Sequence, residues 1–144
     1  MIKSELITAQ HLARQAIIYI RQSSPHQVLT NQESTRLQYA LKQRALSLGW
    51  REEDIEIIDA DLGVSGATAQ HRAGFKEILA KVALGQVGIV LVYEVQRLIR
   101  NCSDLYPLMD MCAYKGCLLG DSDGIYDPAR PNDRLLLGLK RPAT

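Results

Sequence analysis

The apolar run from Val87 to Tyr93 constrains the fold of this chain more than any other stretch. Successive side chains of a strand point to opposite faces of a sheet, so an almost wholly apolar run predicts a strand buried on both faces. Such strands are typical of the centre of a parallel sheet covered by helices. Shorter apolar or β-branched runs predict three further strands, at residues 16–21, 55–58 and 117–119.

Stretches with helical spacing of apolar residues separate these predicted strands. Helices are expected from Asn31 to Leu48, over a segment containing Phe75, Ile78 and Val82, and over a segment containing Leu105, Leu108, Met109 and Cys112. A glycine follows each helix as a stop signal, at Gly49, Gly85 and Gly116. The stretch from Gly120 to Pro131 is predicted to be a loop, and Asn132 to cap a last helix that runs to Lys140.

This alternation predicts the fold class. It implies βαβ units and an α/β architecture of three layers, in which a mostly parallel sheet of four to five strands has helices on both faces. The length of 144 residues fits one such domain. We place this domain at residues 15–140, after an arm or short helix at 1–14 and before a tail at 141–144.

The composition of the chain limits the cellular compartment and the kinds of partner that are expected for it. The chain shows neither an apolar stretch of the roughly 20 residues that a membrane span needs nor a signal peptide, so a cytoplasmic protein without membrane contact is expected. The three cysteines, Cys102, Cys112 and Cys117, have no CxxC spacing and are interpreted as reduced thiols. The net charge of +1 is low for a free-standing DNA-binding domain, so strong DNA affinity would need further contributions.

A serine and an arginine follow the first predicted strand, in the sequence Tyr19-Ile-Arg21-Gln-Ser23. Sites in parallel α/β sheets lie beyond the carboxyl ends of the strands, where the loop from Asp59 to Gln70 and the segment after Tyr93 are also expected. A serine hydroxyl supplies a nucleophile, and a guanidinium grips phosphate with two parallel hydrogen bonds. The pair therefore favours nucleophilic attack on phosphate.

Three more arginines are expected at this edge of the sheet. Arg72 precedes the second helix, and Arg97 and Arg100 share a face if their segment is helical. Together with Arg21 they would offer four positive charges to one phosphodiester. Phosphoryl transfer needs positive charge placed around the phosphate, and metal ions often supply that charge. The alternative is that they are solvated surface charges.

Other chemistries lack their sequence signals. The histidines are scattered, and Asp59 and Asp61 are more typical of a turn than of a metal site. Neither a dinucleotide-binding GxGxxG, nor a GxxxxGK[ST] loop, nor a GxSxG nucleophile elbow is found.

The motifs as a set resemble the catalytic domain of the serine recombinases, the resolvase–invertase family. The resemblance covers residues 16–140 and rests on Tyr-x-Arg-x-Ser at 19–23, Asp-Leu-Gly-Val-Ser-Gly at 61–66, Arg72 before Gly-Phe, and Arg-Leu-Ile-Arg at 97–100. The later stretches Asp123 to Pro128 and Asn132 to Leu139 are similar to the larger recombinases of mobile elements.

The resemblance implies an enzyme that breaks and rejoins double-stranded DNA. Ser23 matches the nucleophile, which forms a 5′-phosphoserine and frees a 3′-hydroxyl. Its neighbour Ser24 fits less well, because the two-residue offset from Arg21 belongs to Ser23. The implied phosphate-binding residues are Arg21, Arg72, Arg97 and Arg100, and the implied supporting residues are Tyr19, Gln27, Asp61 and Ser65.

The resemblance also implies the partners. The family uses no metal, cofactor, nucleotide or small-molecule substrate. It acts as a homodimer on each DNA site and as a tetramer at synapsis. These residues are compatible with integration, excision, inversion and resolution alike. They also do not specify a DNA target sequence.

Two departures from the family pattern leave alternatives open. Gln96 stands where many members have aspartate, and an amide cannot transfer a proton. The family continues with a long helix that forms the dimer interface, whereas residues 141–144 depart from it and Pro142 would interrupt a helix. A truncated, catalytically silent remnant that contacts DNA or another recombinase is therefore the alternative function. An α/β enzyme acting on a small phosphoester is the third.

Overall fold

A five-stranded sheet forms the centre of the computed structural model, which describes residues 5–20, 31–59, 73–93 and 102–139. Its strand order is β2-β1-β3-β4-β5. The strands are β1 (Gln15–Tyr19), β2 (Ile55–Ile58), β3 (Val87–Leu91), β4 (Leu118–Gly120) and β5 (Ile125–Tyr126). The first four pair in parallel, and β5 pairs antiparallel to β4.

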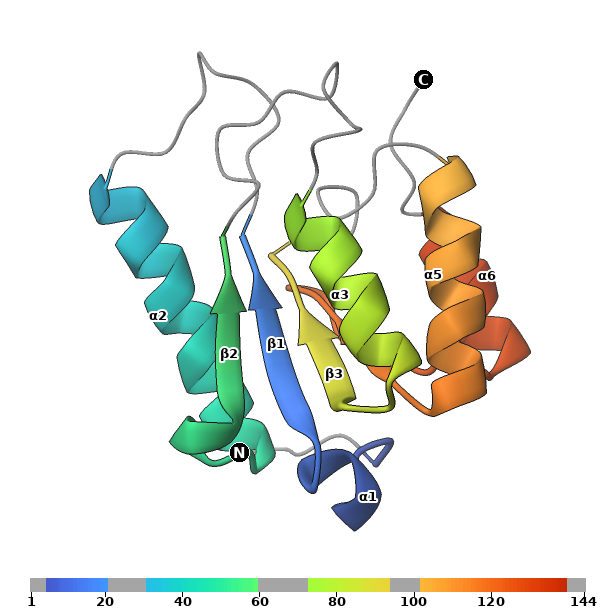
Figure 1. Ribbon diagram of the computed structural model, residues 1–144, viewed down its shortest axis with the longest axis horizontal. Coiled ribbons are helices and arrows are strands. Elements are labelled where there is room, and N and C mark those ends of the chain that lie inside the picture. Colours follow the sequence, from blue (N-terminus) through green and yellow to red (C-terminus); the bar gives the residue numbers. More distant parts are fainter. Residues whose placement is uncertain (1–4, 21–30, 60–72, 94–101, 140–144) are drawn as a thin grey trace.

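Helices connect and cover the strands (Figure 1). They are α1 (Ala9–Leu12), α2 (Asn31–Leu48), α3 (Ala73–Ala83), α5 (Cys102–Lys115) and α6 (Pro131–Leu139), with a short 3₁₀ turn, η2 (Glu52–Asp54), before β2. The predicted glycine stop signals are confirmed, because Gly49, Gly85 and Gly116 follow α2, α3 and α5 with positive φ angles.

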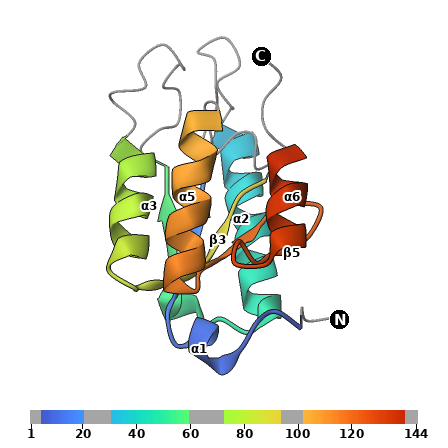
Figure 2. The same cartoon turned by 90° about the vertical axis from the view of Figure 1, so that its right-hand side faces the viewer.

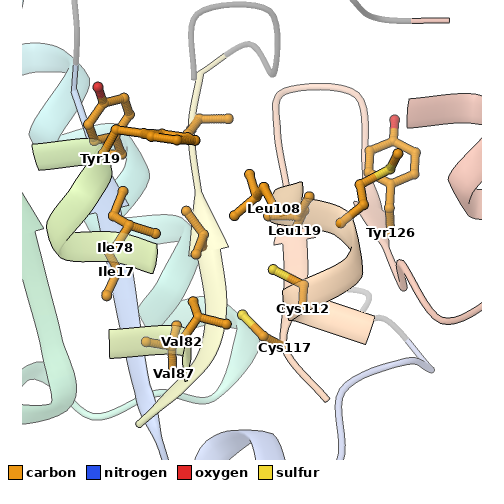
Figure 3. Packing of buried hydrophobic residues seen from close by; sticks show 14 of the residues in the cluster. Ile17, Tyr19, Ile78, Val82, Val87, Leu108, Cys112, Cys117, Leu119 and Tyr126 are labelled. Carbon is orange, nitrogen blue, oxygen red and sulfur yellow. The ribbon is translucent and has the colours of Figure 1, made fainter. Parts of the chain in front are cut away.

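Two hydrophobic clusters lie on opposite faces of the sheet. On one face, alternate residues of β1 such as Ile17 pack with α3, α5 and Leu137 of α6 (Figure 3). On the other face, Ala16, Ile18 and Ile20 pack with α2 and Trp50. Every residue of β3 is buried, as its apolar sequence predicts for a strand between two helix layers. The predicted three-layer α/β fold is therefore confirmed.

The segment before β1 forms the short helix α1, one of the two forms expected there. Its backbone lies directly on β3: a Cβ atom at Gly88 would come 2.2 Å from the carbonyl oxygen of His11. Nearby, Trp50 donates a hydrogen bond from Nε1 to the carbonyl oxygen of Arg14, at 3.0 Å. These contacts close the amino end of the sheet.

Several details differ from the sequence-based expectations. The stretch from Gly120 to Pro131, expected as loop, contains β5, because a tight turn at Asp121 folds the chain back onto β4. The last helix begins at Pro131 rather than at Asn132, and proline suits a first helical position since its missing N–H has no partner to lose there. Strand β1 ends at Tyr19 rather than at residue 21, β3 ends at Leu91 rather than at Tyr93, and β4 covers 118–120 rather than 117–119.

The packing of α1 on Gly88 leads to a stability prediction. We expect Gly88→Ala to lower the free energy of unfolding by about 1–3 kcal/mol or more, because backbone on both sides of the contact must shift. Urea unfolding followed by circular dichroism measures it. The matched control is Gly138→Ala in α6, where an added Cβ meets only ordinary contact with Tyr106 and helix propensity improves. Equal stability of the two variants would contradict the packing of α1.

The burial of two thiols leads to a reactivity prediction. Cys112 and Cys117 are free and fully buried, and loss of solvation raises the pKa of the Cys117 thiol. Because the thiolate is the reactive form, we expect neither to react with an aromatic disulfide reagent at pH 8 until the chain unfolds. A Cys102→Ser background isolates the pair. Rapid reaction of the folded protein would show that this part of the core opens to solvent.

Candidate active site at the carboxyl edge of the sheet

The carboxyl ends of four parallel strands meet at one edge of the sheet. In the register of β1, Tyr19 pairs with Ile58 of β2 and Ile18 pairs with Leu91 of β3. The alignment continues just past the strands, where the Ile20 N–H donates to the Ile58 carbonyl at 3.0 Å. The Val92 N–H likewise donates to the carbonyl of Gly120, at 2.9 Å.

The helices that follow these strands begin at the same edge. Figure 1 and Figure 2 show the first turns of α2, α3 and α5 beyond the tips of the strands. The described chain therefore leaves this edge after Ile20, Asp59 and Tyr93, and it returns there at Asn31, Ala73 and Cys102. Connectivity of this kind is the usual way in which an α/β sheet places a site beyond its strands.

Eight of the nine predicted site residues lie outside the described residues. They are Arg21, Ser23, Gln27, Asp61, Ser65, Arg72, Arg97 and Arg100. The described positions that border them in sequence are the strand and helix ends named above. Ile20 directly precedes Arg21, and Ala73 directly follows Arg72.

Tyr19, the ninth predicted residue, lies in the hydrophobic core. It is 3% exposed and belongs to the same cluster as Phe75 and Ile78 of α3, as Figure 3 shows for Tyr19 and Ile78. Its ring thus helps to hold the end of β1 against the beginning of α3. The first residue of the Tyr-x-Arg-x-Ser pattern therefore packs in the core through its ring, and a supporting role of its hydroxyl in the site stays a prediction.

Asp121, which we did not single out from the sequence, is buried at this edge. It is 1% exposed and directly follows β4. Its Oδ1 atom accepts hydrogen bonds from the backbone N–H groups of Asp123 at 2.9 Å and Gly124 at 3.2 Å. The sequence signal was the turn-forming combination Asp-Ser-Asp-Gly directly after an apolar run.

Described groups with shifted pKa values belong to packing contacts away from this edge. Lys81, in the last turn of α3, has a raised pKa because its Nζ donates to Glu56 Oε1 at 2.7 Å. Burial lowers the pKa of His11 in α1. Glu52, in η2, has a lowered pKa because Lys42 donates to it at 2.5 Å. None of these groups is placed to act on a ligand beyond the strand ends.

Neither a metal centre nor a membrane span emerges from the part of the chain that the structure describes. Within it, His, Cys, Asp and Glu side chains do not form a group of three or more that could hold a metal ion. No described helix is long and apolar enough to cross a membrane.

Comparison with known families gives a match over most of the chain. Residues 16–141 match the family model described as "Resolvase, N terminal domain". An uncharacterized protein of Sinorhizobium fredii (strain NBRC 101917 / NGR234), y4bA/y4pH, is 52% identical over 134 residues. That match covers 93% of this chain but only 19% of the relative's length.

Solved structures share the fold at low sequence identity. The N-terminal catalytic domain of TP901-1 integrase aligns with a TM-score of 0.66 and 21% identity, over 88% of this chain and 90% of that chain. The C-terminal catalytic domain of ISC1926 TnpA, an IS607-like serine recombinase, gives 0.60 and 23%, over 87% and 76%. A resolvase family site-specific recombinase from Streptococcus pneumoniae gives 0.56 and 20%, over 88% and 84%.

Proposed function

This chain belongs to the resolvase N-terminal domain family of serine recombinases, and we propose that it cleaves and rejoins DNA through a covalent bond between Ser23 and a backbone phosphate. The observation that carries the proposal is the alignment of the strand ends beside which Ser23 and the four arginines stand in sequence.

Covalent connectivity supports the convergence of these residues. In the sequence Arg21 directly follows Ile20, which lies just past the end of β1, and Arg72 directly precedes Ala73, the first residue of α3; consecutive Cα atoms are about 3.8 Å apart. Tyr19, two residues before Arg21, and Phe75, three residues after Arg72, pack in one cluster. The stretch with Arg97 and Arg100 leaves from Tyr93, at the end of the strand next to β1.

The proposed chemistry is a transesterification. The Ser23 Oγ atom bonds to phosphorus while the bond from phosphorus to the 3′-oxygen breaks. The serine hydroxyl loses its proton and the 3′-oxygen gains one. One phosphoester replaces another, so a 3′-hydroxyl of a second strand can attack the phosphoserine in reverse and rejoin the DNA. The arginines remain charged at every working pH and stabilise the negative charge of the transition state.

Exposed apolar residues on α6 support contact with a second copy of this protein. Leu135 is 63% exposed and Leu139 is 74% exposed, and one turn apart they lie on the same side of the helix. Burial of neighbouring exposed apolar side chains against a partner is favourable. We infer that a second copy of the recombinase covers them, as the dimerisation of the family implies.

The nucleophile is tested by trapping the covalent adduct. The protein is incubated with nicked duplexes taken from the DNA that flanks its gene, and the products are separated in denaturing detergent. We expect an adduct with wild type and Ser24→Ala, and none with Ser23→Ala. Mass spectrometry of the adduct locates the linkage.

The outcomes separate the functions considered. An adduct that is lost only in Ser24→Ala would move the nucleophile to that residue. Absence of any adduct, while the protein still binds the duplexes in a shift assay, would instead favour the silent DNA-binding remnant.

The phosphate-binding role of the arginines is tested by replacement with lysine. We expect Arg97→Lys to slow adduct formation about 10²–10³-fold, because a point charge replaces a planar two-pronged donor in the transition state. The control is Arg51→Lys, at an exposed residue that contacts Asp54 at 3.2 Å. Equal rates for the two variants in single-turnover assays would remove Arg97 from the site.

A further inference from the structure

The turn between β4 and β5 is built around the buried carboxylate of Asp121. Two backbone N–H groups, of Asp123 and Gly124, donate to its Oδ1 atom. Its own N–H donates to the Gly124 carbonyl at 2.9 Å. These three hydrogen bonds close the turn and fix the direction of the Ser122 N–H, which lies inside it.

This turn holds the carboxyl end of β3 through the backbone. The Ser122 N–H donates to the Tyr93 carbonyl at 3.0 Å, and the Gly120 carbonyl accepts from Val92 at 2.9 Å. The side chain of Leu91 covers Gly120, since a Cβ atom there would come 2.7 Å from Leu91 Cδ2. Tyr93 is the last described residue before the stretch that carries Arg97 and Arg100.

The same turn is tied to the helix on the other face of the sheet. Arg44 of α2 donates from Nη1 to the carbonyl oxygen of Asp121. Helix α2 is the one that follows the stretch with Ser23. The turn thus contacts both the strand that leads to Arg97 and the helix that follows Ser23, although it contains none of the predicted site residues.

We propose that the β4–β5 turn is a positioning element for DNA cleavage, in which Asp121 orients the Ser122 N–H so that it fixes the carbonyl of Tyr93, the last described residue before Arg97 in the sequence. The inference rests on the proposed function. Displacement of a catalytic group by about 1 Å can lower the rate 10²-fold. The loss of one backbone hydrogen bond is therefore expected to slow cleavage measurably if it shifts such a group.

A proline at position 122 isolates the hydrogen bond to Tyr93. Proline lacks the N–H group, yet it suits the second position of a tight turn and would leave the contacts of Asp121 in place. Ser122 does not have a positive φ angle, a conformation that would exclude proline. Ser122→Ala is the matched control, because alanine keeps the N–H group and removes only an exposed hydroxyl.

We expect Ser122→Pro to slow adduct formation about 10–100-fold at saturating DNA, with the DNA concentration for half-maximal rate unchanged. Ser122→Ala should keep the wild-type rate. In a second pair, Asp121→Asn should keep most of the rate because its amide oxygen still accepts both N–H groups, whereas Asp121→Ala should lose it. Asp127→Ala controls for turn loss in general, since Asp127 Oδ1 accepts the Ala129 N–H at 2.9 Å in the next loop.

Amide hydrogen exchange adds a readout that does not depend on catalysis. Exchange at Val92 should quicken in Ser122→Pro and not in Ser122→Ala. If wild type forms an adduct and Ser122→Pro matches its rate, or if Asp121→Asn is as slow as Asp121→Ala, the positioning role is wrong while the proposed function stands. If wild type forms no adduct, the proposed function fails and the positioning role with it.

Discussion

The parallel register of β1 and β3 at the centre of the sheet is the constraint on which the rest of the structure depends. Both strands are buried on both faces, so each strand must present side chains to α2 on one side and to α3 and α5 on the other. A shift of one residue would exchange the two faces and unpack both clusters. The same register aligns Ile20, Ile58 and Val92 at one edge, so the packing of the core also sets the geometry of the candidate site.

The amino end and the carboxyl end of the sheet are built differently. At the amino end, α1 lies on Gly88 and the indole of Trp50 donates to Arg14, so this end is closed by close packing. At the carboxyl end, the turn at Asp121 and the starts of three helices surround the strand tips. The stretches that carry the predicted serine and arginines follow or precede elements at the second end in sequence, so the predicted site and the closely packed amino end lie at opposite ends of the sheet.

Much of the fold follows from the sequence, since β3 is an almost wholly apolar run and the helices α2 and α3 have clear helical periodicity. The fifth strand was missed because two residues, Ile125 and Tyr126, are too few for a period to show. Tyr19 was grouped with the site because it opens the motif, although its ring packs in the core. Asp121 was not predicted as a site residue, because an aspartate before a turn is common. Only the structure shows that it is buried and that its turn is hydrogen-bonded to the end of β3. The roles of Ser23 and the arginines came from their spacing after the strands and from the family resemblance.

The central claim is that Ser23 and the four arginines meet at one phosphate beyond the strand tips. A crystal structure of the Ser23→Ala protein with a nicked duplex from the DNA that flanks its gene tests this claim directly. The account predicts that Arg21, Arg72, Arg97 and Arg100 contact a single backbone phosphate and that the Cβ atom at position 23 points at its phosphorus. Guanidiniums spread over separate phosphates, or a phosphate bound at another edge of the sheet, would contradict it.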